Sequence, residues 1–218
     1  LPTCGWIRFS GKKIDKGKKE TICKSEYTVS YKNFMKVEEE LPLPKPIVLS
    51  FDIEVNSTKI STMPKATRPG DKIFQISCIL SRQGVSDESK YKKTLLTLGN
   101  PLQNITGEDV EIRKFPTEAD LLLGFKDYVL EKSPNLIIGY NILGFDIPYM
   151  IERADNLFIL PEFSMLGFKK NKQCDQKVIK WSSSAYKNQE FKFIDADGRV
   201  FVDLLPLIKR DYKFDNFK

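Results

Sequence analysis

The sequence predicts a mixed α/β fold, with a central mixed sheet flanked by helices and preceded by a small β-rich segment. The chain has 218 residues, of which 41% are hydrophobic and 29% are charged, as is typical of a folded protein. A period-two alternation from Ile47 to Val55 indicates a strand with one face in a core. Further strand patterns and amphipathic helical patterns follow it and alternate toward the end of the chain.

The first 46 residues are predicted to form a separate β-rich unit. Trp6–Phe9 and Tyr27–Tyr31 are β-prone, and the lysine-rich stretch Lys12–Lys19 between them is predicted to be a loop. Prolines at alternate positions in Leu41–Pro46 favour an extended connector and exclude a helix. We therefore predict a domain boundary there, with residues 1–46 on one side and residues 47–218 on the other.

The elements after residue 46 follow from their hydrophobic patterns and end signals. In the strand Ile47–Val55, the odd-numbered positions are all apolar. A Thr-Glu-Ala-Asp sequence from Thr117 resembles a capping box and starts a helix that Ser133-Pro134 ends. The remaining predictions are strands over Lys72–Leu80, Lys93–Leu98, Leu136–Ile138 and Arg199–Val202, a hairpin region over Lys177–Ile194, and helices over 147–154 and Asp203–Tyr212.

Composition excludes several kinds of chemistry. The chain has no histidine, so it contains neither a Ser-His-Asp triad nor a zinc site built on histidine. Its four cysteines form no C-x-x-C pair, and irregularly spaced thiols predict a reducing compartment inside the cell. No apolar run reaches the roughly 18 residues of a membrane-spanning helix, so we expect no membrane partner.

The charge of +6 is unevenly spread along the chain. Residues 1–46 hold 10 basic and 6 acidic side chains, residues 47–164 hold 13 and 16, and residues 165–218 hold 12 and 7. An acidic centre between basic flanks suits a metal site beside a polyanion. On charge alone, a solvated lysine-rich surface is the better interpretation.

Asp52 and Glu54 are the first candidate site residues. Two positions along a strand are about 6.6 Å apart and leave the same face. Two such carboxylates repel each other unless a cation joins them, and oxygen ligands favour Mg²⁺ or Mn²⁺. Pattern alone favours a solvent-facing pair on an edge strand, because the chain holds five acid-x-acid pairs.

The segment from Tyr140 to Asp146 joins a predicted buried strand to the next helix. Asp146 is either a partner of the helix N-terminus or a third carboxylate at the open edge of the sheet. Phe145 is by pattern a core residue. Asp203 is predicted to cap the following helix, and Asp195–Gly198 to form a hairpin turn.

These segments together resemble family B DNA polymerases of the delta type. Phe51-Asp52-Ile53-Glu54 resembles the first exonuclease motif of that family, and residues 139–146 resemble the second. The resemblance runs from about Pro42 to the end of the chain. It also includes Lys45–Ser50, Phe74–Ser77 and Gly198–Leu205.

The resemblance implies a ribonuclease H-like 3′→5′ exonuclease domain that removes mispaired nucleotides from the primer end. It makes Asp52, Glu54 and Asp146 three of four carboxylates that hold two Mg²⁺ or Mn²⁺ ions about 4 Å apart. One ion would activate a water and the other would stabilise the departing 3′ oxygen. Asn141 and Phe145 would lie near the primer terminus, where Phe145 could stack on a frayed base.

The third exonuclease motif of the family, Tyr-x-x-x-Asp, is not found. The residues four positions after Tyr149, Tyr186 and Tyr212 are Arg153, Glu190 and Asn216. We therefore expect the fourth carboxylate beyond Lys218, in a longer protein of which this chain is a piece. We expect the piece alone to bind metal weakly and to cut poorly.

The implied partners are the single-stranded 3′ end of a DNA primer, the rest of the polymerase chain and a processivity factor. The implied location is the nucleus or a viral replication site in the cytoplasm. Three alternatives stay open. They are a free-standing nuclease with the same carboxylates, a non-catalytic exonuclease-like module that binds DNA, and a basic nucleic-acid-binding protein whose carboxylate pair is incidental.

Overall fold

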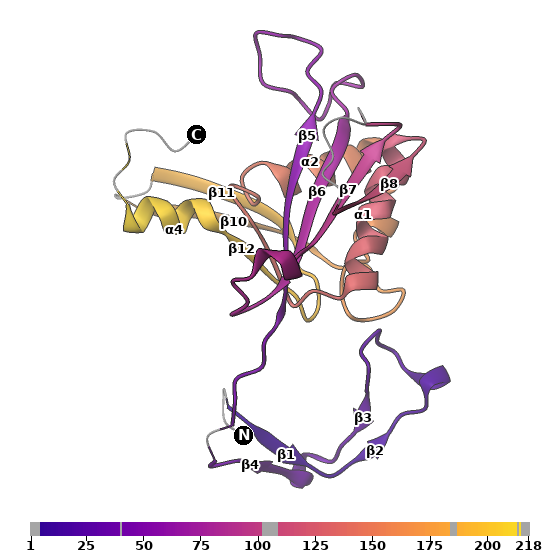
Figure 1. Cartoon of the computed structure of the whole chain (residues 1–218), viewed down its shortest axis with the longest axis vertical. Coiled ribbons are helices and arrows are strands. Elements are labelled where there is room, and N and C mark those ends of the chain that lie inside the picture. The colour runs from indigo at the N-terminus through magenta and orange to yellow at the C-terminus, as the bar shows by residue number, and fades with distance from the viewer. Residues whose placement is uncertain (1–4, 40, 102–108, 184–186, 213, 215–218) are drawn as a thin grey trace.

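The computed structural model describes residues 5–39, 41–101, 109–183, 187–212 and 214. Its centre is a six-stranded sheet in the order β12-β9-β5-β6-β7-β8 (Figure 1). The strands of this sheet are β5 Ile47–Val55, β6 Ile73–Arg82, β7 Lys92–Leu98, β8 Val110–Phe115, β9 Leu136–Gly139 and β12 Val200–Asp203.

The sheet is mixed, as the sequence predicts. β5, β6 and β7 pair antiparallel, whereas β9 runs parallel to both β5 and β12. β8 runs parallel to β7 at the edge. The helices around the sheet are α1 Glu118–Lys132, α2 Asp146–Asn156, the short α3 Leu160–Phe163 and α4 Leu204–Asp211.

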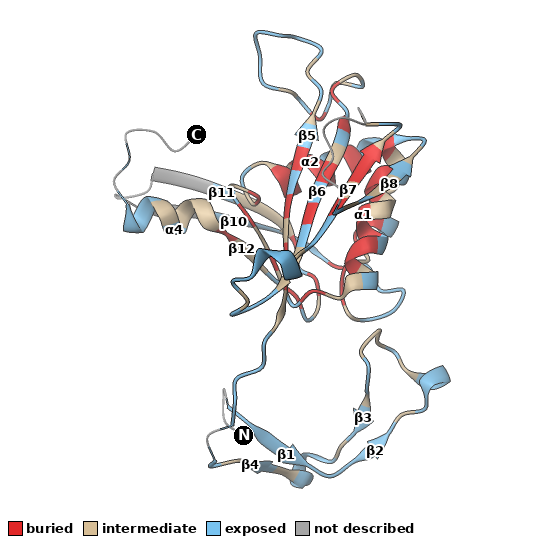
Figure 2. Cartoon of the chain, viewed as in Figure 1, coloured by how far each residue is buried: buried red, intermediate tan, exposed pale blue. Residues whose placement is uncertain are grey.

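The core lies between the sheet and helices α1 and α2. Figure 2 shows the buried residues gathered in the strands and along α1. Phe51 of β5 packs on Phe125 of α1 with 5.1 Å between ring centroids. Leu49 and Ile76 are fully buried in the same cluster. Burying such side chains contributes about 1.5–3 kcal/mol each, so this layer stabilises the fold.

β5 follows its predicted bounds, but it is not an edge strand. It lies between β9 and β6, so both of its sides are paired. Leu49, Phe51 and Ile53 face the core, while Asp52 and Glu54 are exposed. The interpretation of Asp52 and Glu54 as a pair on an edge strand is therefore wrong in that respect, although both side chains do face solvent.

The predicted list of elements needs additions and corrections. β8 and α3 were not predicted, and β6 continues to Arg82 rather than ending at Leu80. The stretch Lys12–Lys19 is not only loop, because it contains strand β2 (Lys12–Lys13) and the 3-10 helix η1 (Lys16–Lys18). The reason is pairing: β2 finds its partner in β3 (Tyr27–Thr28), which local pattern does not show.

The hairpin over Lys177–Ile194 is confirmed as β10 (Gln176–Ser183) paired antiparallel with β11 (Lys187–Ile194). The predicted turn Asp195–Gly198 is present, with Gly198 at φ 84 and the Arg199 amide donating to Ala196. It is not a hairpin turn, however. It leads from β11 into β12, and these strands belong to different sheets.

The first 46 residues form small β elements outside the central sheet. β1 (Ile7–Phe9) pairs with β4 (Phe34–Lys36), and β2 pairs with β3; the other elements before the sheet are the 3-10 helices η1 and η2 (Tyr31–Asn33). Residues 41–46 lie in neither a helix nor a strand. The domain boundary at residue 46 stays a prediction.

Candidate active site

Strand β5 presents Asp52 and Glu54 on its exposed face. Asp52 lies opposite Ser77 of β6 and Glu54 opposite Gln75. The pairing shifts register between Glu54 and Val55, so the strand leaves regular geometry directly after the second carboxylate. The apolar alternation of β5 thus fixes which face carries the acids.

The segment after β9 is shaped by close packing and by Asp203. A Cβ on Gly139 would lie 2.8 Å from the carbonyl oxygen of Phe51, so only glycine fits there. The chain then turns through Asn141 at φ 61, in the left-handed region. The Asp203 carboxylate accepts hydrogen bonds from the amides of Asn141 (2.8 Å) and Leu143 (2.9 Å).

Asp203 also caps helix α4, as predicted. Its side chain accepts a hydrogen bond from the Leu205 amide at 2.9 Å. Asp203 is 8% exposed, so its carboxylate joins three backbone groups in a mostly buried place. One residue therefore fixes both the helix start and the loop that leads to Asp146. The sequence predicted the first of these roles and missed the second.

Asp146 begins helix α2 and points toward β5. It is 3% exposed, and its Oδ1 atom accepts a hydrogen bond of 3.2 Å from the amide of Ile53. The last β5–β9 pair is Ser50 with Ile138, so Asp146 takes over beyond the end of β9. The helix-capping interpretation is thus incomplete, because the carboxylate also bonds to the strand between Asp52 and Glu54.

The Asp146 carboxyl has an unusual pKa. Burial and, to a smaller extent, the charge of Asp52 raise its pKa to about 7, although the hydrogen bond from the Ile53 amide acts in the opposite direction. Ionising a buried carboxyl group beside a like charge is unfavourable in free energy. A proton or a cation between the two groups lowers that free energy.

Asp52 and Asp146 are therefore brought together, and Glu54 is not brought into the same cluster. Within the described ranges, no group of three or more Asp, Glu, Cys or His side chains is close enough to hold a metal ion. Glu54 lies on the same face of β5 as Asp52, two residues further along. The predicted metal-binding role of the three carboxylates stays a prediction.

Asn141 and Phe145, predicted to contact DNA, are both half-buried. The Phe145 ring lies 5.5 Å from the Tyr149 ring and packs against the core. Phe145 also lines a hollow of about 340 Å³. The other lining residues are Pro64, Lys65, Ala66, Thr67, Gly144, Pro148, Tyr149 and Glu152. Phe145 is thus partly a core residue and partly accessible from this hollow, and its predicted contact with DNA is not tested by this geometry.

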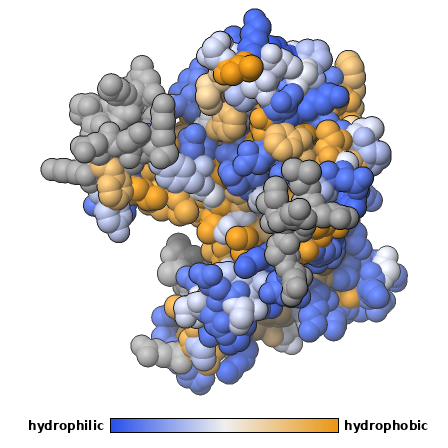
Figure 3. Space-filling model, turned by 45° about the horizontal axis from the view of Figure 1, so that its top comes forward, coloured by the Kyte–Doolittle hydropathy of each residue, from blue (hydrophilic) through white to orange (hydrophobic). Residues whose placement is uncertain are grey.

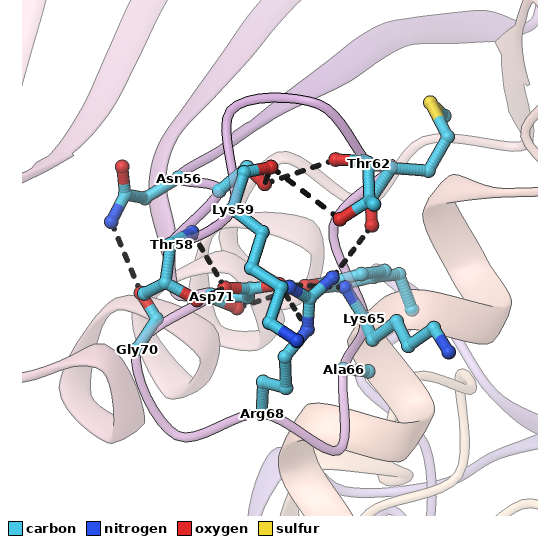
Figure 4. A network of polar contacts seen from close by, with 12 residues as sticks. Asn56, Thr58, Lys59, Thr62, Lys65, Ala66, Arg68, Gly70 and Asp71 are labelled. Atoms are coloured by element: carbon cyan, nitrogen blue, oxygen red, sulfur yellow. Dashed lines mark hydrogen bonds and ion pairs between the residues drawn. The ribbon is translucent and has the colours of Figure 1, made fainter.

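The segment between β5 and β6 is held by Asp71, which the sequence analysis did not single out. Figure 4 shows Asp71 at the centre of this network. Its carboxylate accepts hydrogen bonds from the Thr58 amide (2.8 Å) and hydroxyl (2.6 Å) and from the Lys65 amide (2.8 Å). Arg68 forms an ion pair with it at 2.9 Å. Although burial raises the pKa of Asp71, these bonds lower it to about 2.

A buried ion pair ties this segment to α1 and α2. Arg153 of α2 bonds to Glu118 of α1, with 2.8 Å from Nε to Oε1, and both side chains are almost fully buried. The same guanidinium donates to the carbonyls of Ala66 (2.9 Å) and Arg68 (3.1 Å). Glu118 also accepts from the Ile73 amide at the start of β6 (2.9 Å).

These contacts fix α2, which carries Asp146, against α1, the start of β6 and the segment that follows β5. Arg153 lies between the predicted apolar positions Met150 and Ala154 of its helix. A charged residue beside the apolar face of a helix indicates that the charge is buried and paired. The partner of Arg153, however, is Glu118, which lies 35 positions away in sequence. Sequence pattern alone could not have paired them.

Carboxylates at an open sheet face are the donor set that metal-assisted phosphodiester hydrolysis uses. Comparison with known proteins shows the family of the chain. A sequence model of the exonuclease domain of family B DNA polymerases matches residues 1–218. The chain therefore belongs to the family B DNA polymerases and corresponds to their exonuclease domain.

The relatives are viral and delta-type polymerases. The chain is 47% identical over 227 residues to "DNA polymerase 120R" of Invertebrate iridescent virus 3, covering 100% of the chain and 20% of that protein. It is 37% identical over 223 residues to "Putative DNA polymerase 060R" of Frog virus 3, covering 100% of the chain and 21% of that protein. It is also 35% identical over 216 residues to the "DNA polymerase delta catalytic subunit" of Glycine max, covering 97% of the chain and 19% of that subunit. The chain thus spans about a fifth of the length of these relatives.

Proposed function

We propose that this chain is a ribonuclease H-like 3′→5′ proofreading exonuclease within a DNA-directed DNA polymerase. It hydrolyses the terminal phosphodiester of a DNA primer and so removes mispaired nucleotides. One observation carries the proposal: a buried Asp146 carboxylate bonds to β5 directly beside Asp52. Family membership and the two motif segments support it.

The donor set fits divalent ions. Asp52 and Asp146 offer only oxygen, which Mg²⁺ and Mn²⁺ prefer, and their mutual repulsion favours a bound cation. We propose that these two residues, with Glu54, hold two such ions. When bound, the ions would supply an activated water and charge stabilisation for the departing oxygen.

The chain's own residues orient this site. The Ile53 amide and the start of α2 fix the Asp146 carboxylate, while Asp203 holds the loop that carries Asn141. Phe145, accessible from its hollow, offers an aromatic face to an unpaired base. A mismatched primer end reaches such a site more often because it costs less to unpair.

The proposal is tested by Asp52→Ala/Glu54→Ala and by Asp146→Asn in the full-length polymerase. Each variant is expected to lose digestion of a mismatched primer by about 100-fold or more and to keep DNA synthesis, because a metal ligand set has lost members. Asp155→Asn is the matched control, since Asp155 is an exposed residue of the same helix. Undiminished digestion in the first two variants would overturn the proposal.

A second function is favoured by one observation. Among the described residues, Glu54 does not form a metal-binding cluster with Asp52 and Asp146. A non-catalytic module that only binds DNA would not need such a cluster. In the experiment above, that module would show unchanged nuclease activity in every variant and unchanged DNA binding. A free-standing nuclease is less favoured, because the matching relatives bear the names of DNA polymerases.

The wider setting is also proposed. The exonuclease would work with the rest of the polymerase chain, a DNA primer end and a processivity factor. Cys23, Cys78 and Cys174 are free thiols, as a reducing compartment favours. We therefore propose an intracellular location, in the nucleus or at a viral replication site in the cytoplasm. None of the described helices is long and apolar enough to cross a membrane.

A further inference from the structure

A hollow of about 410 Å³ in the N-terminal segment is lined mainly by lysines. We call it the lysine basin. Its lining residues are Lys13, Ile14, Lys16, Lys19, Ile22, Cys23 and Lys24. In the view of Figure 3, the lower part of the molecule, which includes this segment, is largely hydrophilic.

The positive charge of the basin is balanced only in part by nearby acids. Residues 12–24 hold six lysines and two acids. Among the described residues, Lys13, Lys16 and Lys24 have no ion-pair or hydrogen-bond partner for their ammonium groups. The nearby Glu26 accepts from the Thr21 amide (3.0 Å) and hydroxyl (2.7 Å), so its carboxylate is already engaged. Six lysines against two acids leave a net positive charge in this stretch, which favours a polyanion.

The basin has a defined frame. The Ile14 amide donates to the Glu26 carbonyl at 2.8 Å, and the Lys19 ammonium donates to the Cys23 carbonyl. The segment is anchored on the main body where the Ile22 amide donates to the Phe168 carbonyl at 2.8 Å. The lysines therefore stand on a backbone whose shape is fixed, which reduces the entropy lost when a ligand binds.

Aromatic rings stand next to the lysines. Lys13 pairs directly with Tyr27 across strands β2 and β3, and cross-strand partners share one face. Tyr27 is 41% exposed, and Phe9, 42% exposed, contacts its ring edge-on at 5.2 Å. Lysines beside exposed aromatic rings suit a single strand of nucleic acid, whose phosphates meet the charges while its unpaired bases stack.

The basin lies at the opposite end of the sheet from the carboxylates. Its anchor, the loop before Phe168, is held by Arg199, which donates to the carbonyls of Leu166 and Pro134, each at 2.5 Å. The next residue, Asn135, donates to Ile47 at the start of β5. Glu54 lies seven positions after Ile47, which is about 23 Å along a strand.

We propose that the lysine basin, with Tyr27 and Phe9, binds single-stranded nucleic acid as a second surface, separate from the proposed exonuclease site. Its lysines contact the phosphate backbone without regard to sequence, and the two rings stack on bases. This surface holds a strand at a distance from the carboxylates, so it changes affinity rather than chemistry.

The test measures binding of a fluorescent dT30 oligonucleotide to the full-length polymerase across a range of salt concentrations. Lys13→Gln/Lys16→Gln/Lys24→Gln is expected to weaken binding about 10-fold or more at 0.1 M salt and to reduce the salt slope by about 2, at roughly 0.7 per phosphate contact. Tyr27→Leu is expected to weaken binding about 5-fold or more without changing the salt slope.

The matched control is Lys92→Gln/Lys93→Gln/Lys114→Gln, which removes the same charge from exposed lysines of β7 and β8. It is expected to leave dT30 binding within about 2-fold of the wild type. Equal losses in both triple variants would overturn the proposal, since overall charge would then explain them. The proposal would also be overturned if Tyr27→Leu bound dT30 as the wild type does and polyglutamate competed as strongly as unlabelled oligonucleotide. That result would indicate an acidic protein partner.

Failure of the proposed exonuclease function would look different. Asp52→Ala/Glu54→Ala is expected to bind dT30 as the wild type does in the absence of divalent ions. The basin variant is expected to keep the wild-type turnover rate at saturating substrate and to need more of a long single-stranded substrate to reach it. A lower turnover rate at saturation would show that the basin belongs to the reaction site and would overturn its separate role.

Discussion

The central sheet and the N-terminal segment are both built from strands, yet they are held together by different forces. In the sheet region, Leu49, Ile76 and Leu96 are fully buried. In residues 5–39 and 41–46, no residue is buried, and the contacts there are short strand pairings, hydrogen bonds, ring contacts of Phe9 and an exposed ion pair between Lys36 and Glu38. Hydrophobic burial therefore stabilises the first region, and the second depends on its anchor at Phe168.

This difference bears on function. The carboxylates of the proposed exonuclease site lie on a rigid layer, where Asp146 and Asp52 can be kept close despite repulsion. The lysine basin lies on a thin segment whose side chains stay in water. Binding a flexible polyanion depends mainly on charge and access, so backbone hydrogen bonds and the anchor at Phe168 are enough to present the lysines without a buried core.

The largest expected effect comes from breaking the buried ion pair of the sheet region. Arg153→Leu leaves Glu118 charged and unpaired, and it also removes the donors to Ala66 and Arg68. We expect a loss of about 3–5 kcal/mol in the free energy of unfolding by urea. The exposed Lys36–Glu38 pair of the N-terminal segment is the control, and Lys36→Ala should cost less than about 1 kcal/mol. Similar losses in both variants would contradict the comparison.

A second prediction compares matched truncations in the two regions. Leu49→Ala should lower the free energy of unfolding by about 2–5 kcal/mol, because Leu49 is 0% exposed and its loss leaves a cavity. Ile7→Ala should change it by about 0.5 kcal/mol or less, because Ile7 is 42% exposed. An equal cost at both positions, measured by urea denaturation, would show that the N-terminal segment has a buried core after all.

Asp203 gives an intermediate effect. Asp203→Ala removes the cap of α4 and leaves the amides of Asn141 and Leu143 without their acceptor. We expect a loss of about 1–3 kcal/mol in thermal or urea denaturation, with weaker primer digestion. Asp203→Asn keeps one oxygen acceptor and should recover part of both. If Asp203→Asn loses as much stability and digestion as Asp203→Ala does, the hydrogen bonds accepted by the Asp203 side chain oxygen are not the source of the loss.

The smallest expected effect, per unit of pH, is a pH dependence of the site itself. Burial and the neighbouring Asp52 raise the pKa of Asp146 to about 7 in the folded protein, against an ordinary value of 3.8. Its contribution to stability is therefore fully present below pH 3.8 and is lost as pH rises through about 7.

The measurement is the unfolding free energy of wild type and Asp146→Asn between pH 5 and pH 8 in EDTA. The wild type should lose stability relative to the variant as pH rises, by less than about 1.4 kcal/mol per pH unit, the limit for one proton. A difference that stays constant with pH would mean that Asp146 is already ionised at pH 5.

The strands and helices that were predicted best are those with a strong local pattern. β5 has the bounds of its alternation, and α1 begins after Thr117, whose side chain accepts from the Asp120 amide as the capping pattern indicates. β8 was missed because Glu111, Arg113 and Lys114 crowd its six residues. It becomes a strand by pairing with β7, a contact that its own sequence does not show.

The candidate site divides in the same way. Motif resemblance selected Asp52, Glu54 and Asp146, and alternation correctly predicted that the first two share an exposed face. The contact between Asp146 and the Ile53 amide spans 93 positions, and the Asp203 contact with Asn141 spans 62. No local pattern predicts such contacts, because they depend on which strands lie side by side.

By itself, the sequence determined the class of fold, the family and the residue types available for chemistry. It excluded histidine-based mechanisms outright, since the chain has none. Tertiary structure alone decided that Asp146 is buried beside Asp52, that Glu54 stays apart, and that lysines and aromatic rings of the N-terminal segment meet at one surface. The physical reason is that charge, pKa and binding depend on distances through space, whereas local sequence fixes only the direction in which each side chain leaves its own strand or helix.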